Sequence, residues 1–441
     1  MVRRMLSIAL SVGVVSATGV VSPPAAWAAT LTLPSQSEVL AVLTKVAGYA
    51  QQHYPADAEA YWEKGVYHIG LMGLDSVSDD DAVLAYAEQF GDYNGWVLDR
   101  GGSGNRHNRL AAGQSWLEAY QASPEAIRID DTLKEVAAQT SASLATVTSS
   151  AYFAVDAQFM ALPSFAMVGK LSNNPRYFDR LYALFTYNKT TLGLYDPTAH
   201  LYYRDVHYIY PATQTPNGKK VFWSRGNGWG LGALARILRD LPVSDLRRAA
   251  YVTTFQQMSA ALMAVQRSDG FWNMSLDDAG HYPGPETSGT ALFVYGMAWG
   301  LNTGLLSETT YKPVVAKAWN AMVTTAVHPS GQLGYVQGVG KEPVPSSQVT
   351  YNSSADFGVG VFLLAGSEVV KMAVDGKKYE AENLTATVSS GDSQHDMSDP
   401  SASGGTYHQG SFNTIKDAIQ YSGSVATPGT YNVKNPLRQG H

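Results

Sequence analysis

Two kinds of helical segment alternate along residues 35–371, and this alternation constrains the fold more than any other feature. One kind is apolar on nearly every side, and the other has one apolar face and one polar face. A helix that is apolar all round must be buried on both sides, whereas an amphipathic helix can face water. We therefore expect about twelve helices in an inner ring wrapped by an outer ring, an all-α (α/α)6 barrel, although short apolar spans also suit buried strands. The apolar segments are 62–73, 156–168, 226–238, 289–300 and 355–366, and the amphipathic ones are 35–50, 125–140, 245–267 and 311–325.

The N-terminus has the pattern of a secretory signal. A basic start at Arg3-Arg4 precedes an apolar stretch over 5–21, and Ala26-Trp27-Ala28 suits cleavage between small residues. A membrane anchor is the alternative, but Pro23-Pro24 interrupts the apolar run. We predict that residues 1–29 are removed, that the protein is secreted without membrane association, and that 30–375 form the barrel.

The last part of the chain changes character. Short alternating runs at 378–388, 402–407 and 429–433, separated by glycine and proline turns, predict β-strands. The segment 376–441 resembles the first strands of a galactose-binding-like carbohydrate module. We expect an incomplete β-sandwich with exposed strand edges.

Composition excludes several classes of function. The 441 residues carry a net charge of −6 and no long basic run, which argues against nucleic acid as a partner. The chain has no cysteine, so disulfides, thiolate metal sites and cysteine nucleophiles are impossible. Its ten histidines are scattered, without the spacing of a metal site. We expect a monomer that needs no metal and no cofactor.

Two stretches carry the candidate chemistry. Asp156 opens an apolar helix, and a carboxyl group among apolar neighbours has a raised pKa and can hold a proton near neutrality. In the second stretch, Trp223, Arg225 and Trp229 stand together. A guanidinium can form a forked pair with a carboxylate while indoles cover a ring. The combination indicates a uronic acid sugar.

Three motifs resemble the signatures of the unsaturated rhamnogalacturonyl hydrolases, glycoside hydrolase family 105, and of the related unsaturated glucuronyl hydrolases of family 88. They are DAQFMALP at 156–163, WSRGNGW at 223–229 and ETSGTA at 286–291, and the resemblance spans about residues 35 to 371. It implies an (α/α)6 barrel. The implied substrate is an oligosaccharide made by a polysaccharide lyase, with a 4,5-unsaturated uronic acid at its non-reducing end. The enzyme hydrates the C4=C5 bond, and the product then falls apart.

The resemblance also implies roles for single residues. Asp156 matches the acid and base, although a helix-capping aspartate is the alternative. Arg225, Trp223 and Trp229 match the substrate pocket, against a structural ion pair or core packing. Trp62 stands on a helix where the family lines its pocket with aromatic rings. We expect Glu286 to cap its helix.

Two positions depart from the family pattern. Asn108 and Arg109 stand where an aspartate is usual, and Arg204 stands where some members have a histidine. We expect Asn108 to bind sugar hydroxyls and His207 to compensate for the missing histidine. Arg204 and Arg109 together should make the site more cationic, which suits a carboxylated substrate.

Two other functions stay open at this point. One is an inverting hydrolase of saturated glycosides, which needs two carboxylates roughly 6.5–9.5 Å apart, and Asp156 with Asp205 or Glu286 is the candidate pair. The other is a non-catalytic sugar-binding relative.

Overall fold

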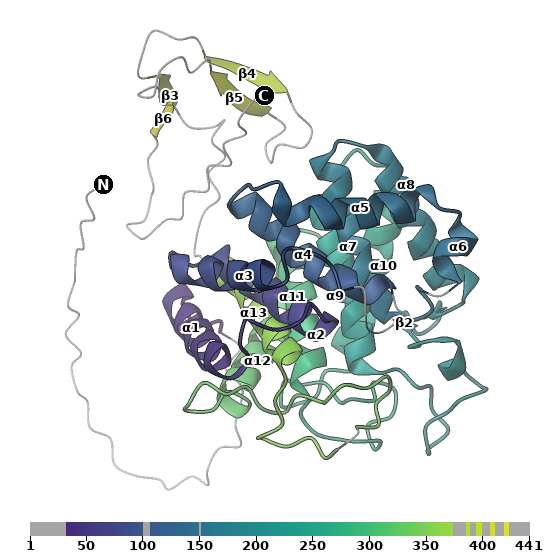
Figure 1. The fold of residues 1–441 in the computed structure, drawn as a ribbon. Helices are drawn as coiled ribbons and strands as arrows, with labels where there is room; N and C mark the ends of the chain where they lie inside the picture. Colours follow the sequence, from purple (N-terminus) through teal and green to yellow (C-terminus); the bar gives the residue numbers. More distant parts are fainter. Residues whose placement is uncertain are drawn as a thin grey trace, which may run out of the picture.

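The computed structural model describes residues 32–99, 106–149, 151–345 and 347–373, together with four strands between 385 and 422. Up to residue 373 its regular structure is almost entirely helical (Figure 1). The helices are α1 (Gln36–His53), α2 (Trp62–Asp75), α3 (Asp81–Tyr93), α4 (Arg106–Ala122), α5 (Ile127–Ser141), α6 (Leu144–Thr148), α7 (Asp156–Leu171), α8 (Pro175–Thr186), α9 (Ser224–Asp240), α10 (Arg248–Ala264), α11 (Thr287–Asn302), α12 (Glu308–Thr325) and α13 (Asp356–Met372).

The long connection between α8 and α9 has structure of its own. It begins with the π-helix η1 (Tyr187–Thr191). The short antiparallel pair β1 (Tyr195–Asp196) and β2 (Leu201–Tyr202) follows, and then the 3-10 helix η2 (Val206–Tyr208). Its last residues lead directly into the Trp223 motif.

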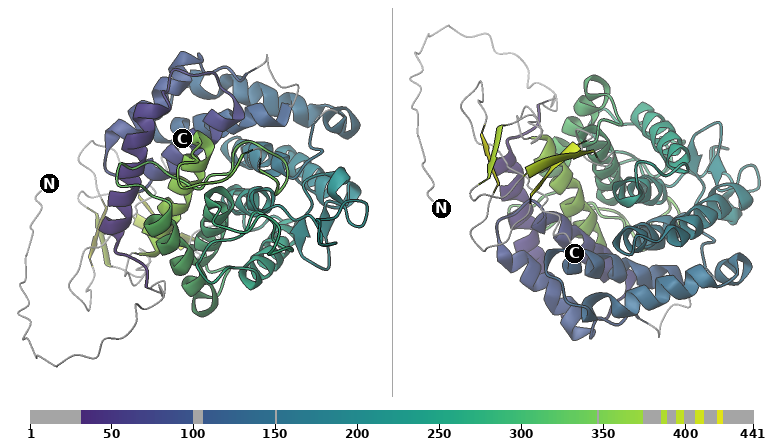
Figure 2. Two further views of the ribbon diagram at one scale, coloured as in Figure 1. Left: turned by 90° about the horizontal axis from the view of Figure 1, so that it is seen from below. Right: turned by 90° about the horizontal axis from the view of Figure 1, so that it is seen from above.

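The described helices pack in two layers. Helices α2, α4, α7, α9, α11 and α13 contact one another in turn, and α13 returns to α2, so these inner helices close a ring. Outside it, α3, α5, α8, α10 and α12 pack on α2, α4, α7, α9 and α11, and α1 packs on α13. Figure 2 shows the helices arranged around a common centre. This is the arrangement of an α/α barrel, and the predicted alternation of buried and half-exposed helices is confirmed.

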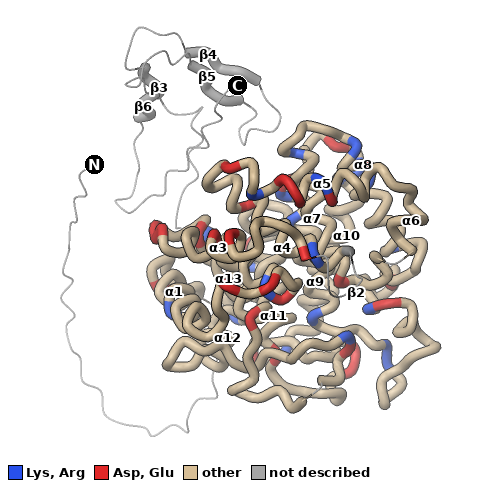
Figure 3. Tube along the Cα trace, in the orientation of Figure 1, with Lys and Arg blue, Asp and Glu red and all other residues tan. Residues whose placement is uncertain are grey.

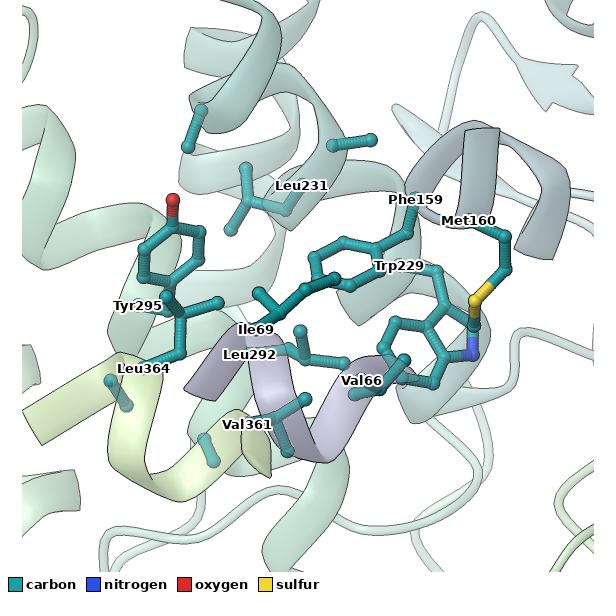
Figure 4. Packing of buried hydrophobic residues seen from close by; sticks show 14 of the residues in the cluster. Val66, Ile69, Phe159, Met160, Trp229, Leu231, Leu292, Tyr295, Val361 and Leu364 are labelled. Carbon is teal, nitrogen blue, oxygen red and sulfur yellow. The ribbon is translucent and has the colours of Figure 1, made fainter. Parts of the chain in front are cut away.

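Apolar side chains from the inner helices fill the centre of the ring (Figure 4). Ile69, Phe159, Leu231, Leu292 and Val361 come from five different helices, and none of them is measurably exposed. Burying a side chain of this size contributes roughly 1.5–3 kcal/mol. The inner helices are therefore apolar on all sides because they are buried on all sides.

Glycines set the closest helix contacts. A Cβ atom on Gly70 of α2 would collide with the backbone of Gly360 on α13. On Gly228, at the start of α9, a Cβ would lie 2.7 Å from the Cβ of Leu292 on α11. The second glycine of the WSRGNGW motif thus serves helix packing.

Charges of both signs are interspersed along the described chain (Figure 3). No helix in that part combines the length and apolarity that a membrane crossing requires. The same residues contain no group of three or more histidine or carboxylate side chains placed to hold a metal ion.

Four strands are described beyond the barrel. β3 (Thr385–Val388) pairs antiparallel with β6 (Ile419–Ser422), and β4 (Gln394–Ser398) pairs antiparallel with β5 (Thr406–Gly410). Two predicted strands, 378–388 and 402–407, overlap β3 and β5. The strand predicted at 429–433 and the proposed signal at 1–29 lie outside the described residues.

Candidate active site

A pocket opens where the inner helices begin. Trp62 is the first residue of α2, Asp156 is the first of α7, and Arg225 is the second of α9. The N-terminal end of a helix carries a partial positive charge, which favours an anion. The pocket has a volume of about 100 Å³, and its lining residues are Trp62, His107, Asn108, Asp156, Met160, Arg204, Trp223, Arg225, Trp229, Val339 and Gly340.

Asp156 lies in this lining with a largely buried side chain. Burial raises the pKa of its carboxyl group, and the charges of Arg204 and Arg225 offset only part of that effect. The Nε of Arg204 donates to Oδ2 of Asp156 at 3.2 Å. The residue at the N-cap of α7 is Val155, and no side chain caps this helix. The geometry therefore favours an acid and base over a helix cap.

The backbone before Asp156 is held from two sides. Val155 donates its amide N–H to the carbonyl of Arg204 at 2.8 Å. From the other side, Asn188 in the π-helix η1 donates to the carbonyl of Ala154 at 2.8 Å. The side-chain amide of Gln158 in turn donates from Nε2 to Oδ1 of Asn188 at 2.8 Å. Single π-turns within helices occur often at functional sites, and here the turn brings in a buried amide that fixes the start of α7.

Arg204 connects two carboxylates. Besides its bond to Asp156, its Nη1 donates to Oδ2 of Asp205 at 2.7 Å. Asp205 is buried, also accepts the amide N–H of His207 at 2.9 Å, and does not line the pocket. Asp205 therefore orients Arg204. His207 is exposed on η2 and is not among the lining residues, so the structure does not bring it to the position predicted for it.

Arg225 lines the pocket, but both terminal nitrogens of its guanidinium donate to backbone carbonyls. Nη1 donates to the carbonyl of Gln337 at 2.6 Å, and Nη2 donates to that of Gly338 at 2.8 Å. The guanidinium lies 4.7 Å from the ring centroid of Trp223. Burial lowers the pKa of Arg225 to about 10, so it stays charged at neutral pH. It was predicted to hold the substrate carboxylate, but in this structure it holds the loop that carries Val339 and Gly340.

Glu286 belongs to the same buried network. Its Oε2 accepts the amide N–H of Gly289 at 2.7 Å, which confirms the predicted cap of α11. Oε1 accepts the amide N–H of Gln337 at 3.1 Å, and Oε1 of Gln337 accepts Nε1–H of Trp223 at 2.8 Å. Among the described lining residues Asp156 is the one carboxylate, because neither Glu286 nor Asp205 reaches the pocket. The pair that an inverting hydrolase needs is therefore missing from the lining.

Replacement of Glu286 by alanine is expected to lower the free energy of unfolding by about 3 kcal/mol, because it leaves buried N–H donors without an acceptor. Chemical denaturation measures this loss. Glu286→Gln keeps one amide oxygen as an acceptor and should lose less. A loss below about 1 kcal/mol for Glu286→Ala would contradict the structural role.

The rest of the lining contains both aromatic and polar residues. Trp229 packs against Trp62 with ring centroids 6.3 Å apart, and both line the pocket as predicted. Asn108 also lines it as predicted, whereas Arg109 pairs with Glu135 at 3.8 Å and does not. The site is therefore less cationic than two added arginines would make it.

His107 is a site residue that the sequence reasoning missed. It is buried, lines the pocket, and its Nδ1 has no hydrogen-bond partner among the described residues. Burial, with a smaller effect of Arg204, lowers its pKa to about 3, so it is a neutral imidazole at physiological pH. Its neighbour Asn108 was the only signal in the sequence that could have led to it.

A model of Glycosyl Hydrolase Family 88 matches residues 40–373. The chain belongs to this family. The motif resemblance, which named families 105 and 88 together, is thereby confirmed. This family 88 member is 32% identical over 361 residues to an unsaturated 3S-rhamnoglycuronyl hydrolase of Formosa agariphila. The alignment covers 77% of this chain and 92% of the relative.

Solved structures agree with this assignment to family 88. A glycosyl hydrolase family 88 protein from Bacteroides vulgatus is 35% identical with a TM-score of 0.71, covering 76% of this chain and 99% of that one. A structure described as a polysaccharide lyase is 33% identical with a TM-score of 0.72, covering 78% and 99%. A family 105 structure from C. acetobutylicum, at 19% identity and a TM-score of 0.60, shares the fold.

Proposed function

We propose that this family 88 enzyme is a hydrolase that releases 4,5-unsaturated uronic acid from the non-reducing end of oligosaccharides produced by polysaccharide lyases. One observation carries the proposal. Asp156, a carboxyl group whose pKa is raised by burial, stands beside Arg204 in a small pocket among helix N-termini. Hydration of a vinyl ether needs an acid that gives a proton and then a base that takes one, and a single carboxyl group of this kind can serve as both.

In the proposed reaction, Asp156 transfers both protons and Arg204 supports it. Protonated Asp156 gives its proton to C4 of the unsaturated ring, and the Asp156 carboxylate then takes a proton from the water that attacks C5. The two steps add one water across the double bond. The hemiketal formed at C5 collapses, and the glycosidic bond breaks. Arg204 stabilises the carboxylate form of Asp156 between the two steps.

Substrate binding falls to the other lining residues. Arg204 is the cation next to Asp156 and is positioned to attract the uronic acid carboxylate. Trp62, Trp223 and Trp229 supply the apolar wall. Asn108 is suited to bonds with sugar hydroxyls. The Formosa relative's name supports an unsaturated rhamnoglycuronyl oligosaccharide as the substrate class.

The test uses the ultraviolet absorbance of the C4=C5 bond. The purified enzyme is mixed with an unsaturated rhamnoglycuronyl disaccharide made by a lyase, and the absorbance should decay as the sugar is released. Unchanged absorbance, together with cleavage of saturated glycosides, would favour the inverting hydrolase instead.

The similar structure described as a polysaccharide lyase supplies a second candidate function. A lyase creates C4=C5 bonds, so absorbance would rise when the enzyme acts on the intact polysaccharide. The sign of the absorbance change therefore separates the two activities.

The proposal extends to the setting of the enzyme. We place it outside the cell as a monomer after removal of residues 1–29, with 376–441 as an incomplete β-sandwich that resembles the start of a carbohydrate-binding module. N-terminal sequencing of protein from the culture medium tests the cleavage, and a first residue before 20 would contradict it.

A further inference from the structure

We propose that Phe153 is the platform on which the second sugar of the substrate, the leaving group, rests. The proposal rests on the function proposed above. It assigns the next subsite to an aromatic ring that the motifs do not contain, and it names the ligand as a pyranose with an apolar face, such as a 6-deoxyhexose.

The position of Phe153 is the first observation. Phe153 is 38% exposed and does not line the pocket. It nevertheless contacts two residues that do. The His107 ring meets it edge-on with centroids 5.8 Å apart, and the Arg204 guanidinium lies 5.7 Å from its centroid. Phe153 therefore lies at the mouth of the pocket and not within it.

The size of the pocket decides what reaches that mouth. Its volume of about 100 Å³ is small, and we take it to hold one sugar ring. Asp156 has to reach C4 and C5 of the unsaturated ring, so that ring fills the pocket. The sugar attached to it must then lie at the mouth, where the exposed face of Phe153 is available.

The backbone around Phe153 is fixed from inside. Asn188 donates to the carbonyls on both sides of it, at 3.1 Å to Tyr152 and 2.8 Å to Ala154. Tyr152 has a φ of 64°, which is costly for a residue with a side chain. Its buried hydroxyl donates to Oε1 of Gln139 at 2.6 Å. The backbone that carries Phe153 is therefore held in place before any ligand arrives, and the His107 and Arg204 side chains contact its ring.

The chemistry of the ring selects the ligand. A phenyl group has no hydrogen-bonding atom, so it recognises C–H groups on one face of a sugar. Arg204, over the same ring, adds a positive charge at the rim. A deoxy sugar, in which a methyl group replaces a hydroxymethyl group, offers the larger apolar face and fits this surface better.

The experiment compares two substrates that share the unsaturated uronic acid. One is its methyl glycoside, which has no second ring, and the other is the disaccharide with a 6-deoxyhexose. In Phe153→Ala the ratio of kcat/KM for the disaccharide to that for the methyl glycoside should fall about tenfold, an effect equal to about 1.4 kcal/mol. Phe153→Tyr, which keeps the ring, should retain most of the ratio.

A matched control removes an exposed aromatic ring elsewhere. Tyr93, at the end of α3, is 58% exposed and is not a lining residue, and Tyr93→Ala should leave the ratio unchanged. An unchanged ratio in Phe153→Ala, or an equal loss with both substrates, would overturn the platform. If the wild-type enzyme leaves the absorbance of both substrates unchanged, the proposed function fails and the platform fails with it.

Discussion

Replacement of Asp156 by asparagine is expected to lower turnover by a factor on the order of 10² or more, while oligosaccharide binding persists. The amide has nearly the same shape as the carboxyl group, but it can neither give nor take the proton at C4 and C5. Loss of the C4=C5 absorbance measures turnover, and calorimetry with the unsaturated disaccharide measures binding. Full activity in Asp156→Asn would exclude the assigned role.

Two further measurements sharpen this prediction. Asp130→Asn makes the same chemical change at an exposed carboxylate paired with Lys134, and it should leave turnover unchanged. In the wild type, turnover should fall as pH rises through the pKa of Asp156, because only the protonated form gives the proton. Burial raises that pKa, so the decline should begin at a higher pH than for an ordinary aspartate. The decline should be absent in Asp156→Asn.

The second large effect is expected at Arg204. Arg204→Met should lower kcat/KM by a factor on the order of 10², because the substrate carboxylate loses its cation and the buried Asp205 loses its cationic partner. The positive charge of Arg204 lowers the pKa of Asp156, so its removal should raise that pKa further. The alkaline decline of turnover should therefore move to higher pH. Arg204→Lys restores the charge and should return the decline towards its wild-type position.

Arg247 offers a matched control. It forms ion pairs with Asp245 and Asp179 and is not among the lining residues. Arg247→Met should therefore leave the pH profile in place. A wild-type pH profile and wild-type kcat/KM in Arg204→Met would show that this guanidinium serves neither the substrate nor the acid.

The barrel fold and most of the pocket-lining residues could be predicted from the sequence. Whether a helix is apolar all round or on one face is a property of neighbouring turns, so it can be read from residues close in the chain. For the same reason Asp156 and Trp62 could be placed at the starts of apolar helical segments. The motifs then brought these segments together as one site.

The tertiary structure alone decided what each polar group bonds to. Arg225 finds its acceptors at Gln337 and Gly338, more than a hundred residues along the chain, and Glu286 meets Gln337 because α11 and α13 pack side by side. The tertiary packing also leaves His207 out of the pocket lining and brings Phe153 next to His107 at the rim. These hydrogen-bond partners depend on which loops meet at one end of the ring of helices. The local periodicity of the sequence does not predict which loops meet there.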